Sequence, residues 1–198
     1  MTEIPIAGLL LAAGEGRRFG ADKLLATLNS GPQRGVPIGV AAYRAFACAI
    51  PGSMVVLRPQ DLALRALFEH EGANVVIARD AAEGLARSLA AGVGRIGPDY
   101  GVVVALADMP WIESATISAI ARAIARGASI AAPRFGGQRG HPVGFAPEHR
   151  AALLDLRGDE GARAIITAHR ESLTLIDVDD PGVLRDIDTP DDLRDDGS

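Results

Sequence analysis

The sequence contains one cysteine, Cys48, among 198 residues. A lone cysteine excludes an internal disulfide and a metal cage built from several thiolates. Because Cys48 lies in an alanine-rich apolar stretch, we expect it to pack as a small hydrophobic side chain. The scarcity of cysteine predicts a reducing, cytoplasmic setting.

Acidic residues outnumber basic ones, 25 to 20, and long apolar runs are scarce. The net charge is −5 and the pI is near 5.4, so we expect no nucleic-acid partner, which would require a basic face. No stretch approaches the roughly 20 apolar residues of a membrane span, so no membrane partner is expected. Glu3 and Pro5 stand where a signal peptide carries basic residues, and Gly8 and Gly14 interrupt the apolar run, which favours a strand there.

The chain alternates between short apolar segments and segments with helical periodicity. This alternation is typical of an α/β fold with a mostly parallel central sheet. With 48% hydrophobic residues the chain can bury one substantial core, so we expect a single domain over residues 1–198. Ile117, Ile120 and Ile124 recur at helical spacing, with Ser114 as the expected N-cap of that helix. The expected strands are residues 6–11, 53–58, 73–78, 102–107, 128–132 and 173–178.

The segment after the first expected strand combines three glycines with three cations, between residues 11 and 23. Glycines let backbone N–H groups approach phosphate oxygens closely, and Arg18 and Lys23 can neutralise phosphate charge. The glycines are spaced one residue too far apart for a dinucleotide fingerprint, and the Gly-Lys-Ser/Thr ending of a P-loop is missing. The segment therefore predicts a different kind of loop for a nucleoside triphosphate. The alternative is a glycine-rich turn with incidental surface cations.

Asp108 directly follows the most hydrophobic expected strand, residues 102–107. In parallel sheets, ligands bind outside the carboxyl ends of the strands, and both Asp108 and the glycine-rich segment fall there. Magnesium typically takes one or two carboxylates together with substrate phosphates, so one aspartate at this place is chemically sufficient. The alternative is an ordinary aspartate that caps the next helix.

Other common catalytic patterns are missing. The four histidines show no H-x-x-x-H spacing and have no cysteine partner, so a zinc site is not expected. His70, His149 and His169 fall in helical patterns and are expected at the surface, whereas His141 lies in a glycine-rich loop. No G-x-S-x-G nucleophile elbow is present, which excludes the usual serine hydrolase arrangement.

Residues 11–23 resemble the L-A-A-G-x-S/G-x-R-M/F-G-x-x-K signature of the nucleotidyltransferases that make molybdenum cofactor dinucleotides. Five further segments resemble the same family in the same order, so that the resemblance spans almost the whole chain. It implies a three-layer Rossmann-like nucleotidyltransferase fold with a mostly parallel central sheet. The five segments are residues 84–92 (GLARSLAAG), 105–110 (ALADMP), 139–145 (RGHPVGF), 158–163 (GDEGAR) and 186–193 (DIDTPDDL).

The resemblance implies transfer of a nucleoside monophosphate to the phosphate of molybdopterin, with Mg²⁺ as cofactor and release of pyrophosphate. The L-A-A-G form favours CTP over GTP as donor, and a molybdoenzyme would be the client. Residues 28–39 depart from the compact P-L-G-G-x-P-L stretch of relatives, which leaves the acceptor open. Two alternatives therefore remain. The chain either uses another phosphorylated acceptor, such as a sugar or alcohol phosphate, or is a non-catalytic chaperone for the cofactor.

The resemblance also implies roles for individual residues. Asp188 either adds a second metal-binding carboxylate beside Asp108 or only shapes a turn with Thr189 as N-cap, and Ser88 either contacts the nucleotide or caps its helix. His141 either donates to the acceptor or is structural. The implied catalytic residues are Arg18, Lys23 and Asp108, and the implied acceptor-binding residues are Arg139, Gly140 and His141. The implied nucleotide-binding residues are Leu11, Ala12, Ala13, Gly14, Gly16, Arg18, Gly20, Lys23 and Ser88.

Overall fold

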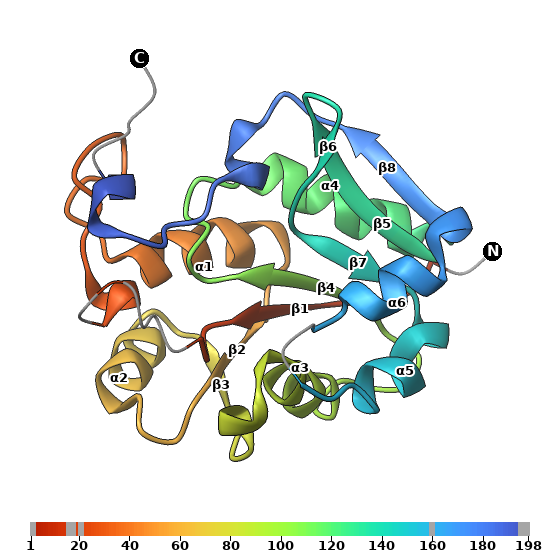
Figure 1. Ribbon diagram of the computed structural model, residues 1–198, viewed down its shortest axis with the longest axis horizontal. Helices are drawn as coiled ribbons and strands as arrows, with labels where there is room; N and C mark the ends of the chain where they lie inside the picture. Colours follow the sequence, from red (N-terminus) through yellow and green to blue (C-terminus); the bar gives the residue numbers. More distant parts are fainter. Residues whose placement is uncertain (1–2, 15–18, 20–21, 159–160, 194–198) are drawn as a thin grey trace.

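The computed structural model describes residues 3–14, 19, 22–158 and 161–193. Its strands are β1 (Ile6–Leu11), β2 (Met54–Leu57), β3 (Asn74–Ile77), β4 (Gly101–Leu106), β5 (Ile130–Phe135), β6 (Gln138–Arg139), β7 (Val143–Phe145) and β8 (Leu173–Asp177). In the described part of the chain they form one eight-stranded sheet with the order β3-β2-β1-β4-β7-β5-β6, and β8 pairs with β5 (Figure 1). The first four strands of this order are mutually parallel, and so are β5 and β8. The sheet is therefore mostly parallel, as predicted.

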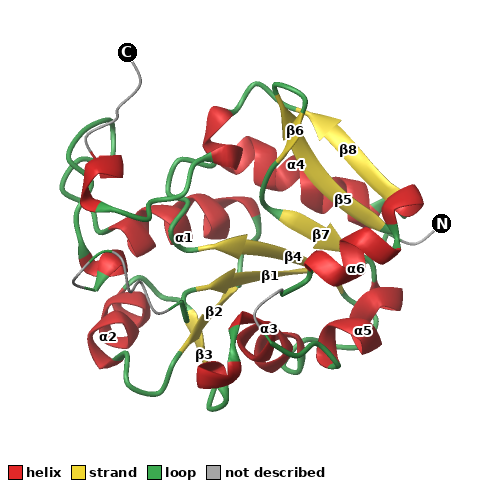
Figure 2. Cartoon of the chain, viewed as in Figure 1, coloured by secondary structure: helices red, strands yellow, loops and turns green. Residues whose placement is uncertain are grey.

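Helices cover both faces of the sheet and give three layers (Figure 2). They are α1 (Ile38–Ala49), α2 (Leu62–His70), α3 (Leu85–Val93), α4 (Ser114–Ala125), α5 (Arg150–Leu154) and α6 (Arg163–Ala168). Buried residues of α1, α2 and α4 form one core with one face of the sheet, and those of α3, α5 and α6 form a second core with the other face. None of the described helices is both long and apolar enough to cross a membrane.

The composition of the central strands explains why both faces are covered. Along β4, Val103 and Ala105 belong to one core, whereas Val102 and Val104 belong to the other. A strand that is apolar on both sides must be sandwiched between helices, as in other parallel sheets. Gly92 brings α3 close to the sheet, because a Cβ there would lie 2.5 Å from a methyl carbon of Leu9.

Two short strands were not predicted. The three residues of β7 lie between β4 and β5 and run antiparallel to both, and β6 pairs antiparallel with β5. Both strands are too short to show a period of two, and Gly144 gives β7 a residue with no side chain. Because β7 pairs with β4, the segment that contains His141 lies beside the carboxyl end of β4.

The α4 helix already includes Ser114, so the prediction of Ser114 as its N-cap is wrong. Glu113 occupies the N-cap position, and its backbone N–H donates to the Asp180 carboxylate at 2.9 Å. The hydroxyl of Thr116 donates to the same oxygen at 2.7 Å. A carboxylate from a remote segment therefore satisfies the start of this helix, in place of a local serine.

Two further expectations about single side chains are wrong. Cys48 is exposed, because it falls on the solvent-facing side of α1. His149 is buried, with 5% of its surface exposed, and its Nε2 lies 2.8 Å from the Ser129 hydroxyl. Its ring also meets that of His169 edge to face, with 4.9 Å between the ring centroids.

Candidate active site

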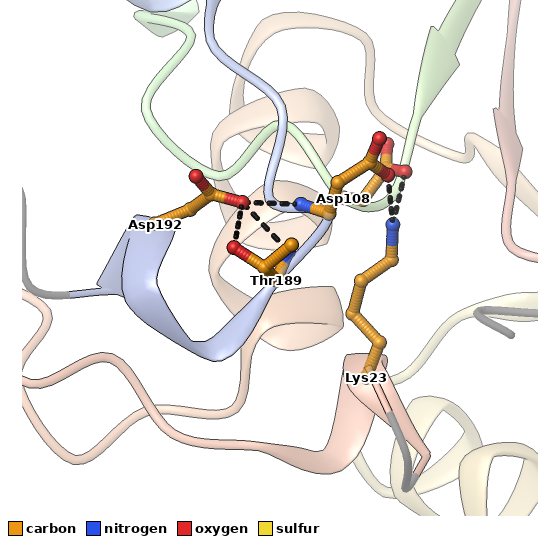
Figure 3. Close-up of polar contacts among 5 residues, drawn as sticks. Lys23, Asp108, Thr189 and Asp192 are labelled. Atoms are coloured by element: carbon orange, nitrogen blue, oxygen red, sulfur yellow. Dashed lines mark hydrogen bonds and ion pairs between the residues drawn. The ribbon is translucent and has the colours of Figure 1, made fainter. Parts of the chain in front are cut away.

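Three residues from distant parts of the sequence meet beside the carboxyl end of β4. The Lys23 ammonium donates to Asp108 Oδ2 at 2.8 Å and to Asp188 Oδ1 at 3.3 Å (Figure 3). The Lys23 side chain is only 11% exposed, compared with 24% for Asp108 and 48% for Asp188. Lys23 is also the only lysine of the chain. We call Lys23, Asp108 and Asp188 the charged cluster.

Backbone hydrogen bonds hold Asp108 in place. The N–H of Ala107 donates to the carbonyl of Leu11 at 3.0 Å, which extends the β1–β4 pairing to the residue before Asp108. The carbonyl of Asp108 accepts from the N–H of Ile187 at 2.9 Å, and the Ile187 side chain is fully buried. This contact attaches the segment that carries Asp188 to the edge of the sheet.

A separate aspartate closes the turn after Asp188. The Asp192 carboxylate accepts from the backbone N–H groups of Asp188 and Thr189, at 2.9 and 2.6 Å, and from the Thr189 hydroxyl (Figure 3). These hydrogen bonds lower the pKa of Asp192. Thr189 directly precedes the short 3-10 helix Pro190–Leu193, and its carbonyl accepts from the Asp192 N–H at 3.2 Å, so it occupies the predicted N-cap position. Because Asp192 supplies the acceptor for this turn, the carboxylate of Asp188 reaches Lys23.

The electrostatics of the charged cluster keep Lys23 protonated. Burial opposes its charge, but the hydrogen bonds and negative charges of Asp108 and Asp188 outweigh this effect and raise its pKa. The ammonium thereby neutralises part of the charge of the two carboxylates.

The cluster also fits a hard divalent cation. Asp108 Oδ1 is buried and has no hydrogen-bond partner in the described part of the chain, and Asp188 supplies a second carboxylate nearby. The described residues contain no group of three or more histidine, cysteine or acidic side chains that could hold a metal. Two carboxylates are nevertheless sufficient for magnesium or manganese when phosphate oxygens complete the coordination.

The glycine-rich segment leaves the sheet beside this cluster. Ala12 and Ala13 continue β1 as buried residues, and the Ala12 N–H donates to the carbonyl of Val56 at 3.0 Å. Gly14 is open, because a Cβ there would meet no atom within 4 Å. The predicted residues Gly16, Arg18 and Gly20 lie outside the described residues.

Ser88 lies inside α3, with 1% of its surface exposed. Gly84, with φ of 113°, occupies the N-cap position of α3, and no side chain caps this helix, so the alternative of Ser88 as a cap is wrong. The Ser88 hydroxyl is buried without a hydrogen-bond partner among the described residues.

Two of the three predicted acceptor-binding residues line one cavity. Arg139 and His141 line a cavity of about 310 Å³, whose walls also include Leu11 and Leu106. Gly140 has a packing role instead, because a Cβ there would lie 2.3 Å from the carbonyl oxygen of Val183. Arg163 also lines this cavity. The GDEGAR motif contains it, but sequence reasoning gave it no role because nothing in the motif shows what the arginine faces.

His141 is neutral at physiological pH. Burial, together with the positive charge of Arg139, lowers its pKa from 6.5 to about 4, and the negative charge of Asp186 only partly opposes this. Its Nδ1 is buried without a partner among the described residues. His141 therefore contributes a polar but uncharged wall to the cavity.

The low pKa of His141 predicts a loss of stability at mildly acidic pH. Below pH 6.5 the unfolded chain binds a proton at this histidine while the folded chain does not, until the pH reaches about 4. The free energy of unfolding should fall over this interval by roughly 3 kcal/mol, from the usual 1.4 kcal/mol per pKa unit. Urea titrations between pH 4 and 8 measure this loss, which should be much smaller in His141→Gln. An equal loss in both proteins would contradict the assignment.

Comparisons with known proteins agree with this geometry. Residues 8–173 match the MobA-like NTP transferase domain. The chain is 28% identical to the purine catabolism protein PucB of Bacillus subtilis, over 93% of this chain and 92% of PucB. It is 29% identical to nicotine blue oxidoreductase of Paenarthrobacter nicotinovorans, over 95% of each chain.

A solved structure shares the whole architecture. The crystal structure of Rv0371c from Mycobacterium tuberculosis superposes with a TM-score of 0.83 at 30% identity, over 98% of this chain and 97% of that one. A second crystal structure of Rv0371c is a complex with manganese, with a TM-score of 0.77 at 27% identity over 96% of each chain. The fold is thus the Rossmann-like fold of nucleotidyltransferases, and the chain belongs to the MobA-like NTP transferase family.

Proposed function

We propose that this protein transfers CMP from CTP to the phosphate of molybdopterin or molybdenum cofactor and releases pyrophosphate. The observation that carries this proposal is the charged cluster at the carboxyl edge of the sheet, beside the open Gly14. Ligands of parallel sheets bind at this edge. Family membership supplies the reaction class, and the L-A-A-G sequence of residues 11–14 favours CTP over GTP.

In the proposed reaction, a phosphate oxygen of the acceptor attacks the α-phosphorus of CTP in line. A new P–O bond forms as the bond from the α-phosphorus to the β-phosphate oxygen breaks, and pyrophosphate leaves. Lys23, Arg18 and the backbone of residues 14–20 would stabilise the triphosphate and its leaving group. No protein nucleophile is required, because a phosphate monoester is already anionic at neutral pH.

The proposed cofactor is Mg²⁺, held by Asp108 and Asp188. When bound, it would neutralise charge on phosphate oxygens as a Lewis acid. The manganese complex of Rv0371c supports divalent metal binding by this fold. Ser88, with its buried and unpartnered hydroxyl, would contact the nucleotide once the donor is bound.

The proposal includes one domain over residues 1–198 that acts in the cytoplasm, with a molybdoenzyme as client. A sheet whose strands run from residue 6 to residue 177 supports one domain. The lone and exposed Cys48 suits a reducing compartment.

A second candidate is transfer to another phosphorylated acceptor, such as a sugar or alcohol phosphate. The departing segment, residues 28–39, supports it. The N–H of Leu28 bonds to the carbonyl of Val36 and the N–H of Gly35 to the carbonyl of Leu28, so this segment forms a closed loop of its own. The names of PucB and nicotine blue oxidoreductase mention no molybdenum acceptor.

Pyrophosphate release tests the proposal. The assay uses CTP or GTP with Mg²⁺, with no acceptor, with isolated molybdenum cofactor or with a sugar or alcohol phosphate, and Asp108→Ala is the inactive control. Release with CTP only when the cofactor is present is the expected result. Release with another phosphorylated compound would favour the second candidate. No pyrophosphate release with either nucleotide, despite tight binding of the cofactor, would identify a chaperone.

Lys23→Ala is expected to raise the KM for CTP by about tenfold or more, the usual effect of losing a charge-assisted hydrogen bond. The melting temperature should change little, because Lys23 belongs to neither hydrophobic core. Initial rates and thermal melts measure the two effects. A large fall in melting temperature with an unchanged KM would show that Lys23 is structural.

The single lysine allows a direct control for this prediction. Selective isotope labelling of lysine gives one side-chain NMR signal, that of Lys23. This signal should titrate above the ordinary lysine pKa of 10.5 and should shift when CTP is added. No shift on saturation with CTP would contradict contact between Lys23 and the nucleotide.

A further inference from the structure

The cavity that Arg139 and His141 line has an apolar interior and a charged margin. Val104 and Phe145 form part of its wall on the sheet, and Leu89 of α3 and Ile166 of α6 line it from the helices. A cavity of about 310 Å³ is large enough for a small ring system. No acidic side chain lines it among the described residues.

The cavity adjoins the charged cluster. Its walls include Leu11 and Leu106, the last residues of β1 and β4, and Asp108 follows two residues later. In the antiparallel register, Val104 pairs with Val143, so the chain before Val143 runs beside the end of β4. His141 and Arg139 therefore approach the same carboxyl edge at which the nucleotide is proposed to bind.

Two arginines supply the positive charge of this cavity. Arg139 belongs to β6 and Arg163 begins α6, and both line the cavity. They lie close enough that the charge of Arg163, added to the effect of burial, lowers the pKa of Arg139. In the described part of the chain, no carboxylate pairs with either guanidinium. By contrast, Arg134 in the neighbouring strand forms a two-pronged ion pair with Asp177.

Two unpaired arginines that repel each other at the margin of an apolar cavity would be stabilised by a shared anion. Guanidinium groups bind phosphate through two parallel hydrogen bonds, which makes arginine suited to this task. His141 adds no competing charge, because it is neutral. The remaining walls favour an apolar partner for the rest of the ligand.

We propose that Arg139 and Arg163 together hold the phosphate of the acceptor, while its ring packs against the apolar walls of this cavity. The acceptor class is then a phosphate monoester of a flat or apolar ring, and not a hydrophilic sugar or alcohol phosphate. This assignment rests on the proposed function and adds Arg163 as a residue that binds and selects the acceptor. The arginines direct the attacking phosphate to the charged cluster.

A binding measurement without nucleotide tests this proposal separately from catalysis. Isothermal titration with 1-naphthyl phosphate, a ring with one phosphate, is compared with titrations of 1-naphthol and glycerol 3-phosphate. The naphthyl phosphate should bind at least tenfold more tightly than either partial probe. Arg139→Ala and Arg163→Ala should each weaken its binding by about tenfold or more, whereas Arg163→Lys should have an intermediate effect.

Arg134→Ala is the matched control, since Arg134 is paired with Asp177 and does not line the cavity. It should leave the affinity unchanged, and thermal melts should show all variants folded. Affinity unaffected by both Arg139→Ala and Arg163→Ala, or lowered equally by Lys23→Ala, would overturn the proposal. Binding of glycerol 3-phosphate as tight as that of 1-naphthyl phosphate would overturn the proposal that the acceptor carries a ring.

The outcome also separates this proposal from the proposed function. Ring-phosphate binding that depends on both arginines, without pyrophosphate release, would keep the site and reject the transferase assignment. Pyrophosphate release whose KM for acceptor is unchanged in Arg163→Ala would keep the function and reject the site.

Discussion

Asp108→Ala is expected to lower the turnover number by on the order of a hundredfold or more, the effect of removing one preorganised electrostatic group. Asp108 is the more buried of the two cluster carboxylates, and its unpartnered Oδ1 is available to a metal ion. Alanine would remove that oxygen and also leave Lys23 with Asp188 alone. The measurement is the rate of Mg²⁺-dependent pyrophosphate release at saturating substrate.

Asp108→Asn separates charge from shape, because the amide keeps the size of the side chain and loses its charge. It should be nearly as inactive as alanine. Asp99→Ala is the matched control, since Asp99 is exposed in the turn before β4, at the opposite end of that strand. Near-normal turnover in Asp108→Ala, with Asp99→Ala also active, would reject Asp108 as a metal ligand.

Asp180→Ala is expected to destabilise the fold by about 3 kcal/mol or more, because several buried donors lose their acceptor. Asp180 is 2% exposed and accepts hydrogen bonds from the Glu113 and Gly182 N–H groups and from the Thr116 hydroxyl. It joins the start of α4 to the segment that continues to Asp188. For a chain of this length the melting temperature should fall by about 6–12 °C.

The control for this prediction is Asp177→Ala. Asp177 pairs with Arg134 at the surface, and an exposed ion pair contributes little to stability. Its melting temperature should stay close to that of the wild type. Denaturant titrations of both variants decide the matter, and equal stability of the two would show that the buried hydrogen bonds of Asp180 contribute little.

The parallel half of the fold could be predicted because its strands are apolar on both faces. Residues 102–107, for example, alternate between two cores, and any strand of this kind must lie inside a sheet. The antiparallel β7 could not be predicted, since three residues that include Gly144 carry no periodic signal. The burial of His149 could not be predicted either, because its partner Ser129 lies 20 positions away.

The charged cluster could be predicted in part. Asp108 is recognisable because it ends a hydrophobic strand, and Lys23 because it closes a glycine-rich segment. Asp180 could not be distinguished among the nine aspartates of residues 177–198, because its partners Glu113 and Thr116 lie 67 and 64 positions away. Likewise, the unpaired state of Arg139 and Arg163 depends on which side chains face one cavity.

The hydrogen bond from the Ile187 N–H to the Asp108 carbonyl makes the charged cluster depend on residues that are synthesised after those of the sheet. The first strands can pair during synthesis, but Asp188 joins Lys23 only after the ribosome has released the segment that carries it. A nascent chain, or one clipped by a protease before residue 186, would keep most of its sheet and lack one carboxylate of the cluster. The proposed role of Asp188 predicts that such fragments release pyrophosphate more slowly than the full chain.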